Sequence, residues 1–321
     1  MGGIGRASGK LILFGEHSAV YGYPAVGVSL PERTTVQLLR ADGMGDWDLA
    51  DIAAEDRGTV GRILTRLEKL LPELSSRGRC RVTVASDVPR GLGFGSSAAL
   101  CAALARAALA HAGELFREHA AGNPVKEWAL AHDAEKLFHG TPSGIDTGLA
   151  ILDGLFAFHP RPPDLPEFRP LRGSPLHLVV AAVPRSESCG ALVAMLGERM
   201  KAGHQETREA IEDLGEAAAA AQKALAGPAA GGAKDIADLA DTAMERLRGL
   251  GLSSPWLDRL LAAGKKAGAL GGKLSGAGGG GAFFLVTRDT ASAQRIASSL
   301  EEEAVRTGVT LAAPARVLTT F

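Results

Sequence analysis

Cysteines and long apolar runs are both scarce in this sequence. The three cysteines, Cys80, Cys101 and Cys189, lie far apart and form no CxxC pair. Their spacing argues against a disulfide framework, a zinc finger or a redox dithiol and favours a reducing compartment. The longest uncharged stretches, such as residues 91–105, reach about 15 residues, whereas a membrane-spanning helix needs about 18–20. We therefore expect a soluble, cytoplasmic protein without a membrane partner.

Neither sign of charge is in excess. The chain has 35 basic and 36 acidic residues, a net charge of −1. Non-specific binding to nucleic acid or to an anionic membrane thereby loses its main driving force, so we expect neither as a partner. Hydrophobic residues make up 46% and charged residues 22% of the 321 positions. This composition is typical of a globular protein with one large or two ordinary domains.

Hydrophobic spacing predicts strands and helices that alternate without a repeat. The predicted strands cover residues 10–14, 25–30, 34–39, 80–85, 177–183, 281–287 and 315–320. The predicted helices cover residues 59–71, 98–115, 126–138, 190–202, 206–226, 233–248, 256–267 and 291–306. Six prolines within residues 160–175 mark this segment as the expected linker between two domains, 1–170 and 171–321.

Glycine is abundant, with 41 residues, and one cluster lies in residues 87–97. This segment stands between a predicted strand and a long alanine-rich helix. Backbone N–H groups at a helix N-terminus attract anions, and glycines let the backbone approach them closely. Ser96 and Ser97 can cap the helix or contact a metal; the alternative is a plain turn with Ser96 as N-cap. The spacing matches neither Walker A nor the GxGxxG fingerprint.

A second glycine cluster, Lys273–Gly281, ends in four consecutive glycines directly before an apolar strand. Such a run costs much backbone entropy, and a structural turn needs only one or two glycines. The segment is therefore either a slack linker or a place where the backbone passes close to a ligand. The tight junction with the strand favours the ligand. Walker A is excluded because Leu274 replaces the Ser or Thr of that motif.

Ionisable residues cluster at two further places. Lys10 stands at the entrance of a predicted strand, and Glu16 and His17 follow its end. Taken alone, a surface lysine and a polar turn explain this pattern better than a site does. Glu135 lies on a predicted helix, and Asp146 follows a loop of Gly, Pro and Ser, where it can bind Mg²⁺, accept a proton or cap a helix.

His132, Glu135 and His139 fall on one helical face, but they do not form an HExxH motif. Solvated histidines are the better interpretation than a zinc site. No nucleophile elbow is present, and no cysteine has an activating neighbour. Two glycine-rich anion loops, a lysine and two carboxylates together indicate an ATP-dependent phosphotransferase that uses Mg²⁺.

Four segments resemble the motifs of the GHMP kinase superfamily, and within it those of the mevalonate kinases. They are Gly9–Gly22, Pro89–Ala99, Lys273–Ala282 and the segment His139–Asp146. The resemblance covers nearly the whole chain. It implies an α+β fold of two domains, an N-terminal ATP-binding α/β domain of a ribosomal-protein-like type (1–170) and a C-terminal ferredoxin-like domain (171–321). It also implies a homodimer.

The same resemblance implies a role for each matching residue. Asp146 would accept the proton of the substrate's primary hydroxyl or orient this hydroxyl, and Lys10 would neutralise the developing charge. Glu135 and Ser97 would hold Mg²⁺. The phosphates of ATP would be bound by Pro89, Gly91, Gly93, Phe94, Gly95, Ser96, Ser97 and Ala98. The substrate would be bound by Glu16, His17, Ser275, Gly276, Ala277 and Gly278.

The reaction implied is phosphorylation of (R)-mevalonate to 5-phosphomevalonate, in isoprenoid precursor biosynthesis. The alternatives are another small alcohol, such as phosphomevalonate or a sugar, and a non-catalytic sensor of ATP or a metabolite. One segment departs from the mevalonate kinase pattern: Cys189 and Gly190 stand about where a Thr and a basic residue are usual. The departure concerns the substrate rather than the phosphotransfer.

Overall fold

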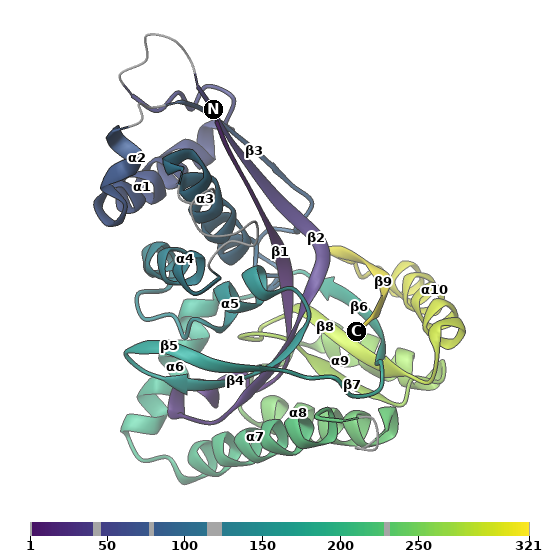
Figure 1. Ribbon diagram of the computed structural model, residues 1–321. Coiled ribbons are helices and arrows are strands. Elements are labelled where there is room, and N and C mark those ends of the chain that lie inside the picture. The colour runs from purple at the N-terminus through teal and green to yellow at the C-terminus, as the bar shows by residue number, and fades with distance from the viewer. Residues whose placement is uncertain (1, 41–45, 77–79, 114–123, 228–231, 321) are drawn as a thin grey trace. The chain divides into compact units, whose positions relative to one another are not determined.

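The computed structural model describes residues 2–40, 46–76, 80–113, 124–227 and 232–320 (Figure 1). These residues form two compact units. Unit 1 comprises Met1–Lys10, Ser29–Arg90 and Gly95–Asp153, and unit 2 comprises Leu11–Val28, Gly91–Phe94 and Gly154–Phe321. Two long strands, β1 (Gly3–Phe14) and β2 (Ala25–Arg40), contribute residues to both units. The predicted boundary at residue 170 stays a prediction.

Helices make up most of unit 1. They are α1 (Ala54–Leu70), α2 (Pro72–Ser76), α3 (Ser96–Ala112), α4 (Pro124–His139) and α5 (Ile145–Leu152). Helix α3 packs against α4 and α5, and its alanine-rich surface lets the strand backbone come close. A Cβ built on Gly5 of β1 would lie 2.0 Å from the carbonyl oxygen of Ala103. Positions 114 and 115, the predicted end of this helix, lie outside the described residues.

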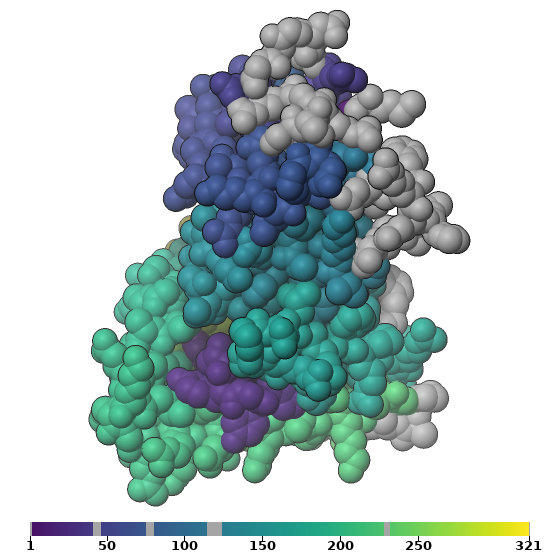
Figure 2. Space-filling model, turned by 60° about the vertical axis from the view of Figure 1, so that its left-hand side comes forward, coloured from purple at the N-terminus to yellow at the C-terminus, as the bar shows by residue number. Residues whose placement is uncertain are grey.

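Helix α1 confirms the predicted helical spacing of its apolar residues. Val60, Ile63, Leu64 and Leu67 are buried on one face, while its polar face is turned to solvent. Figure 2 shows this outer side of α1 together with that of α4, with which it is in contact. Among the residues described, none of the helices has both the length and the apolarity that crossing a membrane requires.

Strand β2 is longer than predicted, because the two expected strands at 25–30 and 34–39 are one. It belongs to a five-stranded sheet of order β1-β2-β4-β5, with β3 (Cys80–Ser86) also paired to β2. Residues 25–28 of β2 pair with β4, whereas residues 34–40 pair with β3. Pro31 lies between these two registers, where neither β3 nor β4 pairs with it. The proline therefore interrupts neither pairing and does not end the strand.

The prediction of a linker at residues 160–175 is wrong. The segment contains the end of β4 (Leu155–Arg161) and all of β5 (Asp164–Pro170), which pair in antiparallel fashion. Strand β5 is the edge strand of the sheet. Proline is tolerated at an edge because its missing N–H faces away from the ladder. High proline content therefore accompanies an edge strand here, and not an unstructured linker.

Unit 2 contains a second, four-stranded antiparallel sheet of order β7-β8-β6-β9. Its strands are β6 (His177–Val183), β7 (Gly271–Leu274), β8 (Gly281–Thr287) and β9 (Ala313–Thr319). Helices α8 (Ala233–Gly249), α9 (Pro255–Lys266) and α10 (Thr290–Thr307) pack against it (Figure 1). The unit also includes α6 (Cys189–Lys201) and α7 (Gln205–Ala224). Strand β7 was not predicted, since it has four residues and two are glycines.

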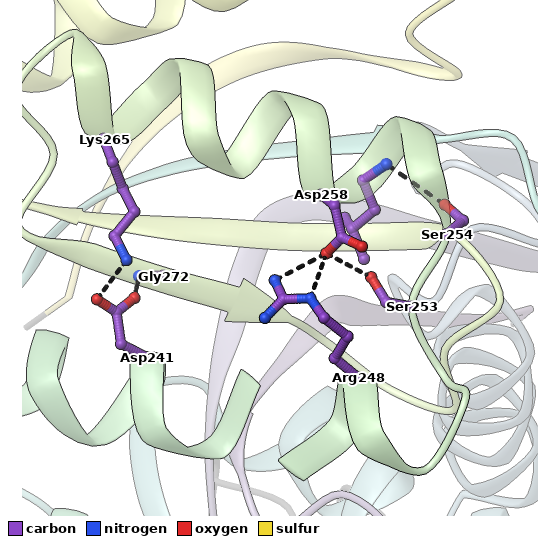
Figure 3. Close-up of polar contacts among 8 residues, drawn as sticks. Asp241, Arg248, Ser253, Ser254, Asp258, Lys265 and Gly272 are labelled. Atoms are coloured by element: carbon purple, nitrogen blue, oxygen red, sulfur yellow. Dashed lines mark hydrogen bonds and ion pairs between the residues drawn. The ribbon is translucent and has the colours of Figure 1, made fainter. Parts of the chain in front are cut away.

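Polar contacts anchor β7 to its neighbouring helices (Figure 3). Asp241 of α8 accepts a hydrogen bond from the backbone N–H of Gly272 at 3.0 Å and pairs with Lys265 of α9 at 2.6 Å. Arg248 of α8 pairs with Asp258 of α9 at 2.8 Å. The hydrogen bond to Asp241 holds β7, which leads into the second glycine cluster, while the two ion pairs join α8 to α9.

Candidate active site

The predicted site residues are divided between the two units. Those in unit 1 are Lys10, Pro89, Gly95, Ser96, Ser97, Ala98, Glu135 and Asp146. Those in unit 2 are Glu16, His17, Gly91, Gly93, Phe94, Ser275, Gly276, Ala277 and Gly278. The glycine-rich segment 87–97 thus runs from unit 1 through four residues of unit 2 and back.

Within unit 1, the chain brings Lys10 and Asp146 together. Lys10 Nζ lies 2.9 Å from Asp146 Oδ2, and the two side chains are 5% and 35% exposed. Asp146 is the second residue of α5, and Gly144 is the N-cap, so Asp146 does not act as the helix cap. Trp128 Nε1 donates to the carbonyl oxygen of Gly144 at 2.9 Å and fixes the start of this helix. The result is a carboxylate that solvent reaches, held beside a buried ammonium group.

Gly95 makes room for the stem of Lys10. It has φ +78°, and a Cβ built there would lie 2.5 Å from Lys10 Cγ. Gly95 is also the N-cap of α3, so the prediction of Ser96 as a possible N-cap is wrong. Ser96 and Ser97 are the first two residues of the helix, and both are partly exposed. Their hydroxyls and backbone N–H groups stand at the positive end of the helix dipole.

Glu135 of α4 is a buried carboxylate without a hydrogen-bond partner. The side chain lies in a residue that is 1% exposed, and within the described part of the chain neither Oε1 nor Oε2 has a partner. Burial, followed by the negative charge of Asp146, raises the pKa of Glu135 to about 8, and the Lys10 charge and the nearby Thr147 hydroxyl oppose the shift. The charge of Glu135 also helps burial to raise the pKa of Cys101 on α3.

These observations fit a divalent cation beside Glu135. Cys101, whose pKa the Glu135 charge raises, lies one turn after Ser97 on α3. Ser97 is therefore on the same face of the helix as Cys101. A cation would compensate the buried carboxylate that now lacks a partner. Among the residues that the structure describes, no group of three or more His, Cys, Asp or Glu side chains could hold a metal. Magnesium suits such a place, because it takes one or two carboxylates and otherwise keeps water and phosphate oxygens.

In unit 2, Glu16 forms a buried ion pair with Lys273 of β7. Lys273 Nζ donates to Glu16 Oε1, and the side chains are 0% and 1% exposed. Nζ also donates to the carbonyl oxygens of Leu13 at 3.1 Å and Leu274 at 2.8 Å. Sequence reasoning missed this pair, although each residue stands in one of the quoted motifs. The predicted contact of Glu16 with substrate stays a prediction, because its carboxylate is enclosed here.

His17 connects the first motif to the second glycine cluster. Its Nε2 donates to the carbonyl oxygen of Ala277 at 3.1 Å, and its backbone has φ +62°. Burial lowers the pKa of His17 to about 4, with a smaller contribution from the charge of Lys273. The ring is therefore neutral at physiological pH, and with the proton on Nε2 its Nδ1 is an acceptor.

The second glycine cluster is packed, which excludes the slack linker, the alternative to the favoured ligand-binding loop. The backbone N–H of Gly279 donates to the carbonyl oxygen of Leu252 at 2.8 Å. Gly278 has φ +91°, and a Cβ there would lie 2.4 Å from the same oxygen. Ser275 Oγ accepts a hydrogen bond from the N–H of Ile12 at 3.1 Å. The segment is held by the chain on several sides.

A basic residue that sequence reasoning did not select lies beside these loops. Arg185 follows β6, and its Nη1 donates to the thiol sulfur of Cys189. A Cβ built on Gly93 would lie 2.9 Å from Arg185 Nη2. A Pro-Arg pair directly after a buried strand was the available signal.

This arrangement defines a phosphotransferase of a known family, the GHMP kinases, to which the chain belongs. The model for "GHMP kinases N terminal domain" matches residues 59–154, and the model for "GHMP kinases C terminal" matches residues 191–306. The family uses ATP as phosphate donor, and this chain is a kinase that acts on an alcohol of a small molecule. The predicted fold class, a two-domain α+β GHMP kinase fold, is confirmed.

Within the family, the chain is similar to several curated mevalonate kinases. The enzyme of Pyrococcus horikoshii is 30% identical over 92% of this chain and 93% of its own length. That of Pyrococcus furiosus is 30% identical over 92% and 93%. The crystal structure of Leishmania major mevalonate kinase in complex with R-mevalonate has a TM-score of 0.79 and 22% identity, with 100% of this chain and 96% of that chain covered.

Proposed function

We propose that this kinase phosphorylates the primary hydroxyl of (R)-mevalonate and produces 5-phosphomevalonate and ADP. Full-length similarity to curated mevalonate kinases, at 30% identity over 92% of the chain, is the observation that carries the proposal. The intact pair of Lys10 and Asp146 supports catalysis rather than a sensor function. The reaction would serve isoprenoid precursor biosynthesis.

The proton of the acceptor hydroxyl is assigned to Asp146. As the hydroxyl oxygen attacks the γ-phosphorus, its proton passes to the Asp146 carboxylate, and the bond to the β–γ bridging oxygen breaks to release ADP. The exposure of Asp146, 35%, gives a substrate access to this carboxylate. Lys10 places a positive charge next to it, where negative charge develops during transfer. Positioning and charge neutralisation supply most of the rate enhancement in such reactions.

Residues of the first glycine cluster are assigned to the phosphates. Gly95 and the N-terminal residues of α3, Ser96 and Ser97, offer backbone N–H groups to anionic oxygens. Glu135 and Ser97 are assigned to Mg²⁺, which when bound would neutralise charge on the phosphates. The orphaned oxygens of Glu135 support this assignment.

The acceptor is assigned to His17 and residues 275–278. A neutral imidazole with a free Nδ1 lone pair accepts a hydrogen bond from an alcohol and does not form an ion pair with a carboxylate. We therefore infer that His17 contacts a hydroxyl group of mevalonate. The packed backbone of Ser275, Gly276, Ala277 and Gly278 supplies neighbouring N–H and C=O groups.

The test is ADP release from Mg·ATP by the purified protein with (R)-mevalonate, phosphomevalonate, galactose or homoserine as acceptor. Turnover with mevalonate alone is the expected result. Turnover with another of these alcohols, or with none, would contradict the proposal. The Asp146→Asn variant serves as the inactive control.

A homodimer and a cytoplasmic location are further proposals that rest on the family resemblance. Light scattering of the purified chain tests the first, with a mass of twice 33.1 kDa expected. Cell fractionation tests the second.

A further inference from the structure

The guanidinium of Arg185 lies against glycines of both glycine clusters. A Cβ built on Gly93 would lie 2.9 Å from Nη2, and one built on Gly281 would lie 2.6 Å from Nε. A Cβ built on Gly276 would lie 3.8 Å from the same Nη2. All of these residues belong to unit 2. The space that side chains would otherwise fill is therefore used by one cation.

Backbone hydrogen bonds hold the surrounding segments in place. The N–H of Ala282 donates to the carbonyl oxygen of Leu92 at 2.7 Å. The N–H of Ser186 donates to the carbonyl oxygen of Gly279 at 2.8 Å. The first glycine cluster, the second and the segment that carries Arg185 are thus joined directly. The guanidinium therefore stands in a backbone setting that these hydrogen bonds hold in place.

Most of the hydrogen-bonding capacity of Arg185 is unused. Nη1 donates to Cys189 Sγ, whereas Nε is buried and has no hydrogen-bond partner among the described residues. A guanidinium carries five N–H donors in a planar fork that matches the oxygens of a phosphate. A buried charged donor that is left unpaired is costly, so the geometry calls for an anion.

We propose that Arg185 binds the terminal phosphoryl group of ATP. Cys189 and Gly190, which depart from the family pattern, cannot do so because neither has a cationic side chain. The proposal rests on the proposed function, since it concerns the same site. The two glycine clusters that enclose Arg185 are the segments assigned to the phosphates and to the acceptor. A guanidinium at that place stabilises the charge of the phosphoryl group during its transfer.

Nucleotide binding tests the proposal without turnover. Calorimetry compares Mg·ADP with the Mg²⁺ complex of the non-hydrolysable analogue β,γ-imido-ATP, on the wild type, Arg185→Gln and the control Arg295→Gln. Arg295 is an exposed residue of α10 whose guanidinium contacts Ser292. We expect Arg185→Gln to bind the analogue at least tenfold more weakly and to bind ADP as the wild type does. Equal losses for the two nucleotides, or no loss, would overturn the proposal.

Steady-state kinetics separates the phosphoryl group from the carboxylate of the acceptor. Arg185→Gln is expected to lower kcat and leave the KM for mevalonate within about twofold of the wild-type value. A higher KM for mevalonate with unchanged kcat and unchanged analogue binding would assign Arg185 to the acceptor and overturn the proposal. A wild-type protein that binds both nucleotides but does not phosphorylate mevalonate would contradict the proposed function alone.

If Arg185→Gln does not fold, Arg185→Lys carries the same test. Lysine keeps the positive charge but presents a single ammonium group in place of the planar guanidinium. We expect analogue binding to be several-fold weaker with ADP binding unchanged. Wild-type affinity for both nucleotides would overturn the proposal.

Discussion

Two buried lysines each pair with a carboxylate, but solvent reaches only one of the pairs. In unit 1, Lys10 lies 2.9 Å from Asp146, and the carboxylate is 35% exposed. In unit 2, the Lys273 and Glu16 side chains are 0% and 1% exposed. The residue types are the same, and both lysines are nearly inaccessible. The difference lies in the carboxylate and its access to other molecules.

This difference in exposure distinguishes an ion pair that can take part in catalysis from one that stabilises the fold. Lys273 is held by Glu16, by two carbonyl oxygens and by the rings of Phe14 and Phe284 at 5.7 and 5.5 Å. Burial lowers the pKa of Lys273, and the charge of Glu16 opposes the shift. The enclosed pair joins the first motif to β7. The open carboxylate of Asp146 can exchange a proton with an alcohol.

Loss of Lys273 is expected to have the largest effect on stability. Lys273→Met leaves the Glu16 carboxylate buried without its cation, which costs about 3–5 kcal/mol. Urea unfolding measures the loss. The double variant with Glu16→Gln removes both charges and is expected to recover part of it. If the free energy of unfolding of Lys273→Met lay within about 1 kcal/mol of the wild-type value, Lys273–Glu16 would not be a sealed pair, that is, one closed to solvent.

Loss of the open carboxylate is expected to affect the rate instead. Asp146→Asn keeps the shape of the side chain but cannot take up the proton, so kcat should fall about 10²–10⁴-fold. The free energy of unfolding should change by less than about 1 kcal/mol, because this pair is partly hydrated. Asp153→Asn, at an exposed pair with Arg33, is the matched control and should keep the wild-type kcat. A rate for Asp146→Asn within threefold of wild type would contradict the assignment.

Glu135 tests whether a cation belongs beside the open pair. Glu135→Gln is isosteric but neutral, and we expect the Mg²⁺ concentration for half-maximal activity to rise about 10–100-fold. Titration of activity with Mg²⁺ at fixed ATP measures this. An unchanged Mg²⁺ requirement would remove Glu135 from the metal site.

The lowered pKa of His17 predicts how the free energy of unfolding depends on pH. Its pKa is lowered from 6.5 to about 4 in the folded state, so the unfolded state binds more protons between these values. Stability is therefore full above pH 6.5 and is lost as the pH falls toward 4. Between pH 7 and 4.5 the loss is on the order of 2 kcal/mol. Urea unfolding of wild type and His17→Gln over this range should differ by that amount; parallel curves would contradict it.

Gly95 and Gly203 form a matched pair that tests the room left for the stem of Lys10. Both have positive φ, +78° and +75°, but a Cβ at Gly95 meets Lys10, whereas a Cβ at Gly203 meets nothing within 4 Å. Each alanine variant should lose about 1–2 kcal/mol from backbone strain. Gly95→Ala should in addition lower kcat about tenfold by displacing the ammonium group. Equal kcat values for the two variants would contradict this role of Gly95.

The sequence predicted most of the fold and the quoted motifs, because apolar spacing and glycine clusters are local signals. The helices over 190–202 and 256–267, for example, are confirmed within one residue at each end. Pairing partners are not local, so the fused strand β2 and the edge strand β5 were missed. The Lys273–Glu16 pair was missed for the same reason, because its two residues lie 257 positions apart. Arg185 was missed because the glycines beside it, Gly93 and Gly281, are also distant from it in the sequence. Roles assigned by resemblance, such as that of Glu16, stay predictions.

The most direct test compares Lys10→Met with Lys273→Met in one experiment, by phosphoryl transfer to mevalonate and by urea unfolding. We predict that Lys10→Met loses at least about 10²-fold in kcat and less than about 1.5 kcal/mol in stability. Lys273→Met should show the larger stability loss, about 3–5 kcal/mol. If Lys10→Met lost more stability than Lys273→Met while keeping its kcat, the distinction between an open catalytic pair and a sealed structural pair would be contradicted.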